Sequence, residues 1–140
     1  EFSQSGVDAG ARMVLGGERP VLPGYFVAPT LLADCTPDIH VVRVEAFGPV
    51  IVIMPYDDDE QAVALANDSD YGLFNYVFAG DTKRAYRIGQ RLESGNVGLN
   101  VVQPHMEAPF GGFKMSGVGR DRGKWGISAY SELQAISWLG

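Results

Sequence analysis

Short apolar runs alternate with polar, turn-forming segments along the chain, and their lengths predict strands and helices. Pro49–Met54 is a continuous run of aliphatic, largely β-branched residues, which is typical of a strand buried on both faces. The same reasoning predicts further strands at 12–15, 30–33, 73–79, 96–102 and 133–139. Helices are predicted at 2–11, 57–66, 81–92 and 123–130.

Polar residues mark where two of these helices begin. Asp57–Glu60 precede an alanine-rich segment, and acidic side chains favour a helix start because free backbone N–H groups point outward there. In the next helix, Asp81 or Thr82 is expected to be the cap, and Gly95 is expected to end it. Its apolar face is predicted to contain Ala85, Ile88 and Leu92.

The order of elements between residues 49 and 102 is strand, helix, strand, helix, strand. At this spacing it predicts right-handed crossovers in a largely parallel sheet with flanking helices, so the predicted fold class is α/β. Ligands bind beyond the carboxyl ends of the strands in such sheets. The glycine-rich segment 107–120 follows the strand at 96–102, and its phenylalanines predict a packed loop. We therefore expect a functional site there.

Composition and charge exclude several classes of function. The net charge of −6, from 11 basic and 17 acidic residues, disfavours nucleic-acid binding. Cys35 is the only cysteine, so an internal disulfide and a multi-thiolate metal site are excluded, and the usage fits a reducing compartment such as the cytoplasm. His40 and His105 lie far apart, and we predict no metal site. No apolar run has the roughly 18–20 residues that a membrane span needs.

Two side chains are candidates for chemistry on the residues alone. Cys35 lies between acidic and polar residues that disfavour a thiolate, so we interpret it as a small, partly buried thiol rather than a nucleophile. Glu45 lies among apolar residues just before the 49–54 strand. It is either a surface carboxylate at a turn or an acceptor for two hydroxyls of a diol such as a ribose, with Phe47 as an apolar wall. The residues alone leave these two alternatives even.

Several segments together resemble conserved patterns of the NAD(P)-dependent aldehyde dehydrogenase superfamily. Glu45–Val50 resembles E-x-F-G-P-V, and Pro109–Arg120 resembles P-F-G-G-x-K-x-S-G-x-G-R. Further segments follow the order of the family: Gly24–Thr30 (G-x-F-x-x-P-T), Ala66–Leu73 (A-N-x-x-x-Y-G-L), Gly95–Asn100 (G-x-V-x-x-N) and Tyr130–Glu132 (Y-T-E). Each pattern alone is weak, but in this order they span nearly the whole chain and are highly specific.

The resemblance implies a cofactor and a substrate class. Glu45 would bind the nicotinamide ribose of NAD or NADP, and Phe47 would pack beside the nicotinamide ring. Asn100 and Phe110 would shape the tunnel for an aldehyde substrate. The loop 101–108, with His105 and Met106, would decide which aldehyde fits.

The resemblance also implies that the chain corresponds to the C-terminal part of such an enzyme. Residues 1–130 would be a partial catalytic domain, and 131–140 an oligomerisation strand through which a homo-oligomer forms. The family's nucleophilic cysteine and glutamate base precede this region, so we expect no catalytic residue here and no activity from the 140 residues alone. The chain also lacks an initiating methionine, as a piece of a longer protein would. The alternative is a non-catalytic binding or assembly module derived from the same fold.

Overall fold

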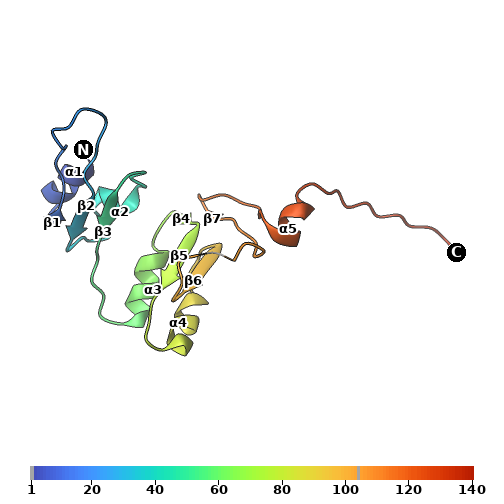
Figure 1. Ribbon diagram of the computed structural model, residues 1–140. Helices are drawn as coiled ribbons and strands as arrows, with labels where there is room; N and C mark the ends of the chain where they lie inside the picture. The colour runs from blue at the N-terminus through green and yellow to red at the C-terminus, as the bar shows by residue number, and fades with distance from the viewer. Residues whose placement is uncertain (1, 104) are drawn as a thin grey trace. The chain divides into compact units, whose positions relative to one another are not determined.

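The computed structural model describes residues 2–103 and 105–140, and the backbone divides into two compact units (Figure 1). The first unit ends at Asp68, and the second extends from Ser69 to Gly140. Each unit is described by itself below. Pro104, inside the predicted specificity loop, and Glu1 lie outside the described residues.

The first unit is built on a three-stranded sheet in the order β1-β2-β3. Strand β1 pairs antiparallel with β2, and β2 pairs parallel with β3, with Leu31 opposite Ile51. Leu32 on the central strand is fully buried, together with Ala11, Cys35, Ile39 and Val41. The elements are α1 (Phe2–Asp8), β1 (Arg12–Leu15), β2 (Thr30–Ala33), α2 (His40–Arg43), β3 (Val50–Val52) and α3 (Asp59–Asn67).

Strand β3 departs from the prediction of burial on both faces. Val50 and Val52 are half-buried against the core, whereas Ile51 is 63% exposed. Strand β3 is also an edge of this three-stranded sheet. The prediction was therefore wrong for the unit as described, because only one face of the strand is packed within it.

The second unit contains the crossover that the sequence predicts. Strands β5 and β6 pair in parallel, with Phe74 opposite Asn96, and helix α4 connects them. Strands β4 and β7 form a separate antiparallel pair. The elements are β4 (Tyr71–Gly72), β5 (Phe74–Val77), α4 (Thr82–Gly89), β6 (Asn96–Leu99), β7 (Phe113–Lys114) and α5 (Gly123–Ser128).

The α/β class is confirmed, but the strands do not form one continuous parallel sheet. In the part of the chain that the structure describes, they are distributed over three sheets, and β3 pairs with β2 instead of extending the β5–β6 pair. The sequence predicts which segments are strands because apolar periodicity is local. It does not predict the pairing between segments, which depends on distant partners.

Helix caps follow the sequence closely. The Asp58 carboxylate accepts a hydrogen bond from the Gln61 backbone N–H at 2.8 Å, and the Asp81 carboxylate accepts one from Lys83 at 2.9 Å. Helix α4 ends at Gly89 rather than near Gly95, and its Ala85 is buried as predicted. The four-residue helix α2 was not predicted, since it is too short to show a periodic pattern.

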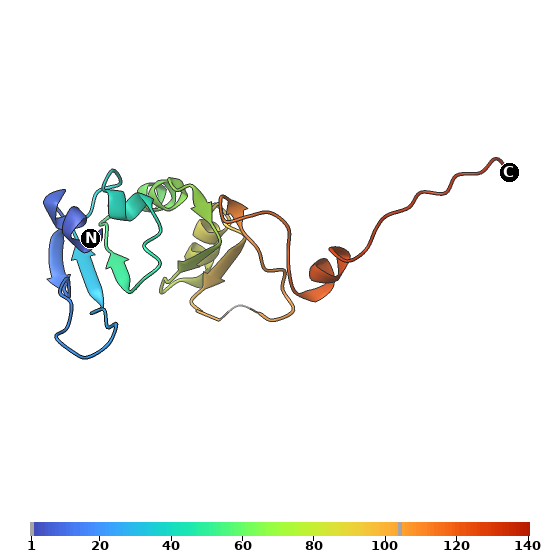
Figure 2. The same ribbon diagram turned by 90° about the horizontal axis from the view of Figure 1, so that it is seen from above.

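The C-terminal residues 131–140 follow α5 as an extended, exposed segment (Figures 1 and 2). The predicted strand at 133–139 has no hydrogen-bonded partner among the described residues. Its apolar side chains Leu133, Ile136, Trp138 and Leu139 are all exposed. Among the helices described, none is long and apolar enough to cross a membrane.

Candidate functional site

Glu45 and Phe47 lie in the irregular segment that connects α2 to β3. Both ends of this segment are anchored: the Val44 N–H donates to His40 O at 3.0 Å, and the Thr30 N–H donates to Pro49 O at 2.8 Å. Arg43, just before it, donates to the Asp68 carboxylate at 2.7 Å and to the Asp68 carbonyl at 2.9 Å. The sequence between these anchors is short, so the loop is held at both ends while its side chains project into solvent.

Both predicted cofactor-binding side chains are accessible. Glu45 is exposed, and the ring of Phe47 is 93% exposed. Phe47 also has a φ of 45°, in the left-handed region that a bulky side chain rarely adopts. A carboxylate and an aromatic face two residues apart, neither covered by its own unit, fit a ligand that carries both hydroxyls and a flat ring.

Asn100 is placed directly after β6 and ties the ends of two parallel strands together. Its backbone N–H donates to Val77 O at 2.9 Å. Its side-chain amide donates to Ala79 O at 3.0 Å and accepts from the Ala79 N–H at 2.8 Å. The amide is therefore committed to the backbone beyond β5. These hydrogen bonds could not be predicted from the sequence, although asparagine is enriched at left-handed positions such as the φ of 53° found here.

Phe110 sits in a packed corner, as the glycine-rich pattern predicts. Its backbone exchanges two hydrogen bonds with Asp121, of 2.8 and 2.7 Å. The guanidinium of Arg122 lies over its ring, 4.5 Å from the centroid. The side chain of Asn96, at the start of β6, donates to Gly111 O at 3.0 Å. These contacts fix Phe110 relative to the β5–β6 pair.

His105 and Met106, the predicted specificity residues, lie in the exposed loop before this corner. The Glu107 N–H donates to Nδ1 of His105 at 3.3 Å. The Ala108 N–H donates to His105 O at 3.1 Å. The loop therefore turns back towards Phe110 through local hydrogen bonds.

Two motif residues to which the sequence analysis gave no role are structural. Ser116 Oγ accepts a hydrogen bond from the Gly72 N–H at 3.0 Å, which joins the glycine-rich segment to β4. Lys114 pairs with Glu93 at 2.8 Å and donates to Ser69 O at 3.0 Å. Their spacing in the motif was visible, but partners more than 20 residues away could not be inferred from it.

Cys35 occupies the core of the first unit, as predicted. It is 4% exposed and belongs to the apolar cluster around Leu32, so no substrate reaches its thiol. Within residues 2–103 and 105–140, no group of three or more His, Cys, Asp or Glu side chains is placed to hold a metal ion.

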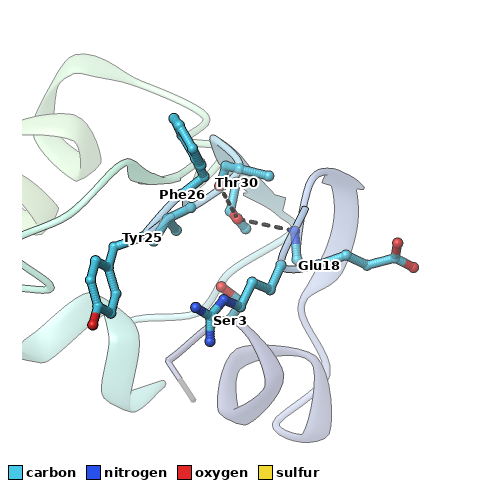
Figure 3. Close-up of a pocket in the computed structure, with 9 residues that line it drawn as sticks. Ser3, Glu18, Tyr25, Phe26 and Thr30 are labelled. Atoms are coloured by element: carbon cyan, nitrogen blue, oxygen red, sulfur yellow. Dashed lines mark hydrogen bonds between the residues drawn. The ribbon is translucent and has the colours of Figure 1, made fainter. Parts of the chain in front are cut away.

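A pocket of about 370 Å³ lies in the first unit, beside the loop between β1 and β2 (Figure 3). Thr30 anchors it: its hydroxyl accepts from the Gly17 N–H at 3.0 Å and donates to Ala28 O at 3.2 Å. Tyr25 and Phe26 are among the residues that line the pocket. The Tyr25 side chain is fully exposed and points outward. None of the predicted site residues lines this pocket.

Comparison with known proteins gives consistent matches over nearly the full chain. Residues 1–136 match the family model described as "Aldehyde dehydrogenase family". A succinate-semialdehyde dehydrogenase [NADP(+)] from Deinococcus radiodurans is 43% identical over 134 residues, which cover 95% of this chain. A chloroplastic betaine aldehyde dehydrogenase from Beta vulgaris is 39% identical over 140 residues, or 98% of this chain. The chain spans about 28% of the length of each of these two relatives.

Solved structures agree with the sequence matches. The crystal structure of Mycobacterium tuberculosis aldehyde dehydrogenase complexed with NAD+ superimposes with a TM-score of 0.91 at 36% identity. The match covers 99% of this chain and 30% of that one.

Proposed function

The chain belongs to the aldehyde dehydrogenase family, and on that premise we propose that the complete polypeptide oxidises an aldehyde to a carboxylic acid with NAD+ or NADP+. The observation that carries the proposal is the family match over residues 1–136. Relatives named for NADP+ and a related structure with NAD+ support a nicotinamide cofactor without separating the two. The free, buried Cys35 agrees with a cytoplasmic location.

The residues of this chain that would hold the cofactor are Glu45 and Phe47. The exposed Glu45 carboxylate would accept hydrogen bonds from the ribose hydroxyls, and the exposed Phe47 ring would pack beside the nicotinamide. When bound, the nicotinamide supplies a hydride acceptor. The role of these two side chains is to orient that ring, and neither takes part in bond breaking.

The second unit supplies the wall of the substrate tunnel in this proposal. Phe110 is held by the Asp121 bridge and presents an aromatic surface, while His105 and Met106 lie on the loop that precedes it. Asn100 acts through its position at the end of β6, since its amide is occupied by Ala79. The segment 131–140 is proposed to pair with another subunit as an oligomerisation strand.

The nucleophilic thiol comes from outside these 140 residues. Cys35 is buried in the core of the first unit, so it has no access to an aldehyde. We therefore propose that the isolated chain, residues 1–130 of which form a partial catalytic domain, does not oxidise aldehydes.

Exchange of Glu45 for glutamine in the complete polypeptide tests the cofactor site. Glutamine keeps the shape but loses the charge that strengthens hydrogen bonds to hydroxyls, which are worth about 1.5–3 kcal/mol with a charged partner. We expect the Kd for NADH or NADPH, measured by fluorescence titration, to rise on the order of 10-fold or more. Glu60→Gln, at the start of α3, is the matched control and should leave the Kd unchanged. An unaltered Kd in Glu45→Gln would remove Glu45 from the site.

A further inference from the structure

Arg122 is half-buried and places its guanidinium directly against the predicted tunnel residue Phe110. Its guanidinium carbon lies 4.5 Å from the centroid of the Phe110 ring, within the range of a cation–π contact. Its Nη1 atom is buried, and no described residue accepts a hydrogen bond from it. The positive charge is therefore neither solvated at that atom nor neutralised by a carboxylate there.

The backbone holds Arg122 in this place. Its φ of 66° lies in the left-handed region, and its N–H donates to Asp121 Oδ1 at 2.7 Å. Asp121 itself exchanges two backbone hydrogen bonds with Phe110. On the far side, Gly123 packs against the Glu107 carbonyl so closely that any side chain at 123 would overlap it. The charge and the ring are thus parts of one fixed arrangement rather than two mobile side chains.

An aromatic ring attracts cations because the π-electron density on its faces is negative. Arg122 already occupies one face of Phe110, and its charge opposes a second cation on the other face. By contrast, a neutral aldehyde meets only the apolar ring, and an aldehyde with a carboxylate is attracted by the same charge. Arg120 carries the same sign of charge and cannot neutralise Arg122; its guanidinium donates to Gly112 O at 3.1 Å and lies over the Phe113 ring.

We propose that Arg122 determines substrate charge, so that the enzyme disfavours cationic aldehydes and accepts neutral and anionic ones. This inference rests on the proposed function, because it needs Phe110 in the tunnel wall. The aldehydes after which two relatives are named differ in the relevant charge: betaine aldehyde carries a quaternary ammonium group, whereas succinate semialdehyde carries a carboxylate. Arg122 acts through the field at Phe110 and is a specificity-determining residue, with no part in the reaction steps.

The size of the effect follows from the geometry. A substrate cation on the face of Phe110 opposite Arg122 would lie roughly 9 Å from the guanidinium, about twice the observed ring distance. Coulomb repulsion at that separation reduces kcat/KM about 20-fold at an effective dielectric constant of 20, and about twofold in a water-like environment. We therefore expect a change between these limits when the charge is removed.

Two aldehydes of nearly the same shape measure this directly. Betaine aldehyde and 3,3-dimethylbutanal differ only in a central nitrogen cation or neutral carbon, and succinic semialdehyde serves as the anionic probe. In the complete enzyme, Arg122→Met should raise kcat/KM for betaine aldehyde relative to 3,3-dimethylbutanal by about 2- to 20-fold. It should lower the relative value for succinic semialdehyde. Comparison between variants cancels the different intrinsic reactivities of the three aldehydes.

Two further variants keep the test decisive. Arg122→Lys retains the charge and should preserve the selectivity, while Arg87→Met removes an exposed arginine of α4 and should leave all ratios unchanged. If Arg122→Met does not fold, Arg122→Gln removes the charge and keeps a polar side chain, and unchanged ratios in that variant relative to the wild type overturn the inference. Unchanged ratios in Arg122→Met overturn it as well. A wild-type enzyme that oxidises neither these three aldehydes nor any member of a wider aldehyde panel with NAD+ or NADP+ refutes the proposed function instead.

Discussion

Gly95 is the position where one added methyl group should disturb the candidate site most. It precedes β6, and its N–H donates to Gly72 O at 3.0 Å. A Cβ at this position would overlap the Gly111 carbonyl oxygen and lie 2.7 Å from the Gly111 carbonyl carbon. These are backbone atoms that cannot rotate away. In Gly95→Ala the corner that contains Phe110 must therefore shift by roughly 1.5–2 Å to reach ordinary contact distance.

The cost has two parts. Overpacking of this kind destabilises by about 1–3 kcal/mol. A shift of the corner also weakens the hydrogen bond from Asn96 to Gly111 O, which contributes about 0.5–1.5 kcal/mol. We expect Gly95→Ala to lower the free energy of unfolding by about 2–4 kcal/mol. With a denaturant slope of about 2 kcal/mol/M, the middle of the usual range, the urea midpoint followed by circular dichroism should fall by about 1–2 M.

Gly80 provides the matched control, because a Cβ there meets nothing within 4 Å. Gly80→Ala should change the free energy of unfolding by less than about 1 kcal/mol, and in the stabilising direction if unfolded-chain entropy dominates. In the complete enzyme, Gly95→Ala should also reduce kcat/KM, since displacement by about 1 Å near a reacting centre can cost 100-fold. If the two alanine variants unfold at the same urea concentration, the close approach of Gly95 to Gly111 is not part of the folded structure.

Two further predictions concern pH and assembly. The Thr36 hydroxyl, 2.6 Å from the Asp38 carboxylate, is the main reason that the pKa of Asp38 is lowered, so Thr36→Ala should raise that pKa towards its usual value in a carboxyl NMR titration. Because the folded-state pKa lies below the unfolded one, ionised Asp38 stabilises the fold above the unfolded pKa. That contribution is lost as the pH falls through the folded pKa, and Thr36→Ala should weaken this dependence of stability on pH. An unchanged Asp38 titration in Thr36→Ala would exclude the Thr36 hydrogen bond as the cause of the lowered pKa. The exposed apolar segment 131–140 should drive self-association. In analytical ultracentrifugation the 140-residue chain should therefore sediment as a dimer or larger species, and a chain ending at residue 130 should sediment as a monomer. If both chains sediment as monomers, the prediction is refuted.

Local features of the fold followed from the sequence because their causes are local. The acidic caps Asp58 and Asp81 were predictable from their position before alanine-containing helices, and both accept backbone hydrogen bonds. The parallel β5–β6 pair was predictable from strand, helix and strand lengths. The solvent exposure of Ile51 was not predictable from the sequence. A run of β-branched residues indicates that a strand can be buried on both faces, but it does not show whether its own unit contains elements that cover both faces.

The candidate site was predictable at the level of residues and not of contacts. The motif containing Phe110 indicated a packed corner, and the structure shows one. Arg122, twelve residues later, gave no signal as a partner of that ring, since stacking across a bridge depends on the turn between them. The two hydrogen bonds between the Asn100 side chain and the Ala79 backbone were equally unpredictable, because these residues become neighbours only after β5 and β6 have paired.

Backbone strain points to the same residues from an independent direction. Among the described residues, Asp34, Phe47, Asn100, Lys114 and Arg122 have a positive φ without being glycine. For Asn100, Lys114 and Arg122, hydrogen bonds to Ala79, Ser69 and Asp121 respectively offset the strain of about 1–3 kcal/mol.

Phe47 differs from these three residues, because its ring is 93% exposed and gains almost no packing within its own unit. A strained backbone that presents a bare aromatic ring is stabilised by whatever covers that ring. The positive φ and the exposed ring of Phe47 are the features that the proposed contact with a nicotinamide would need.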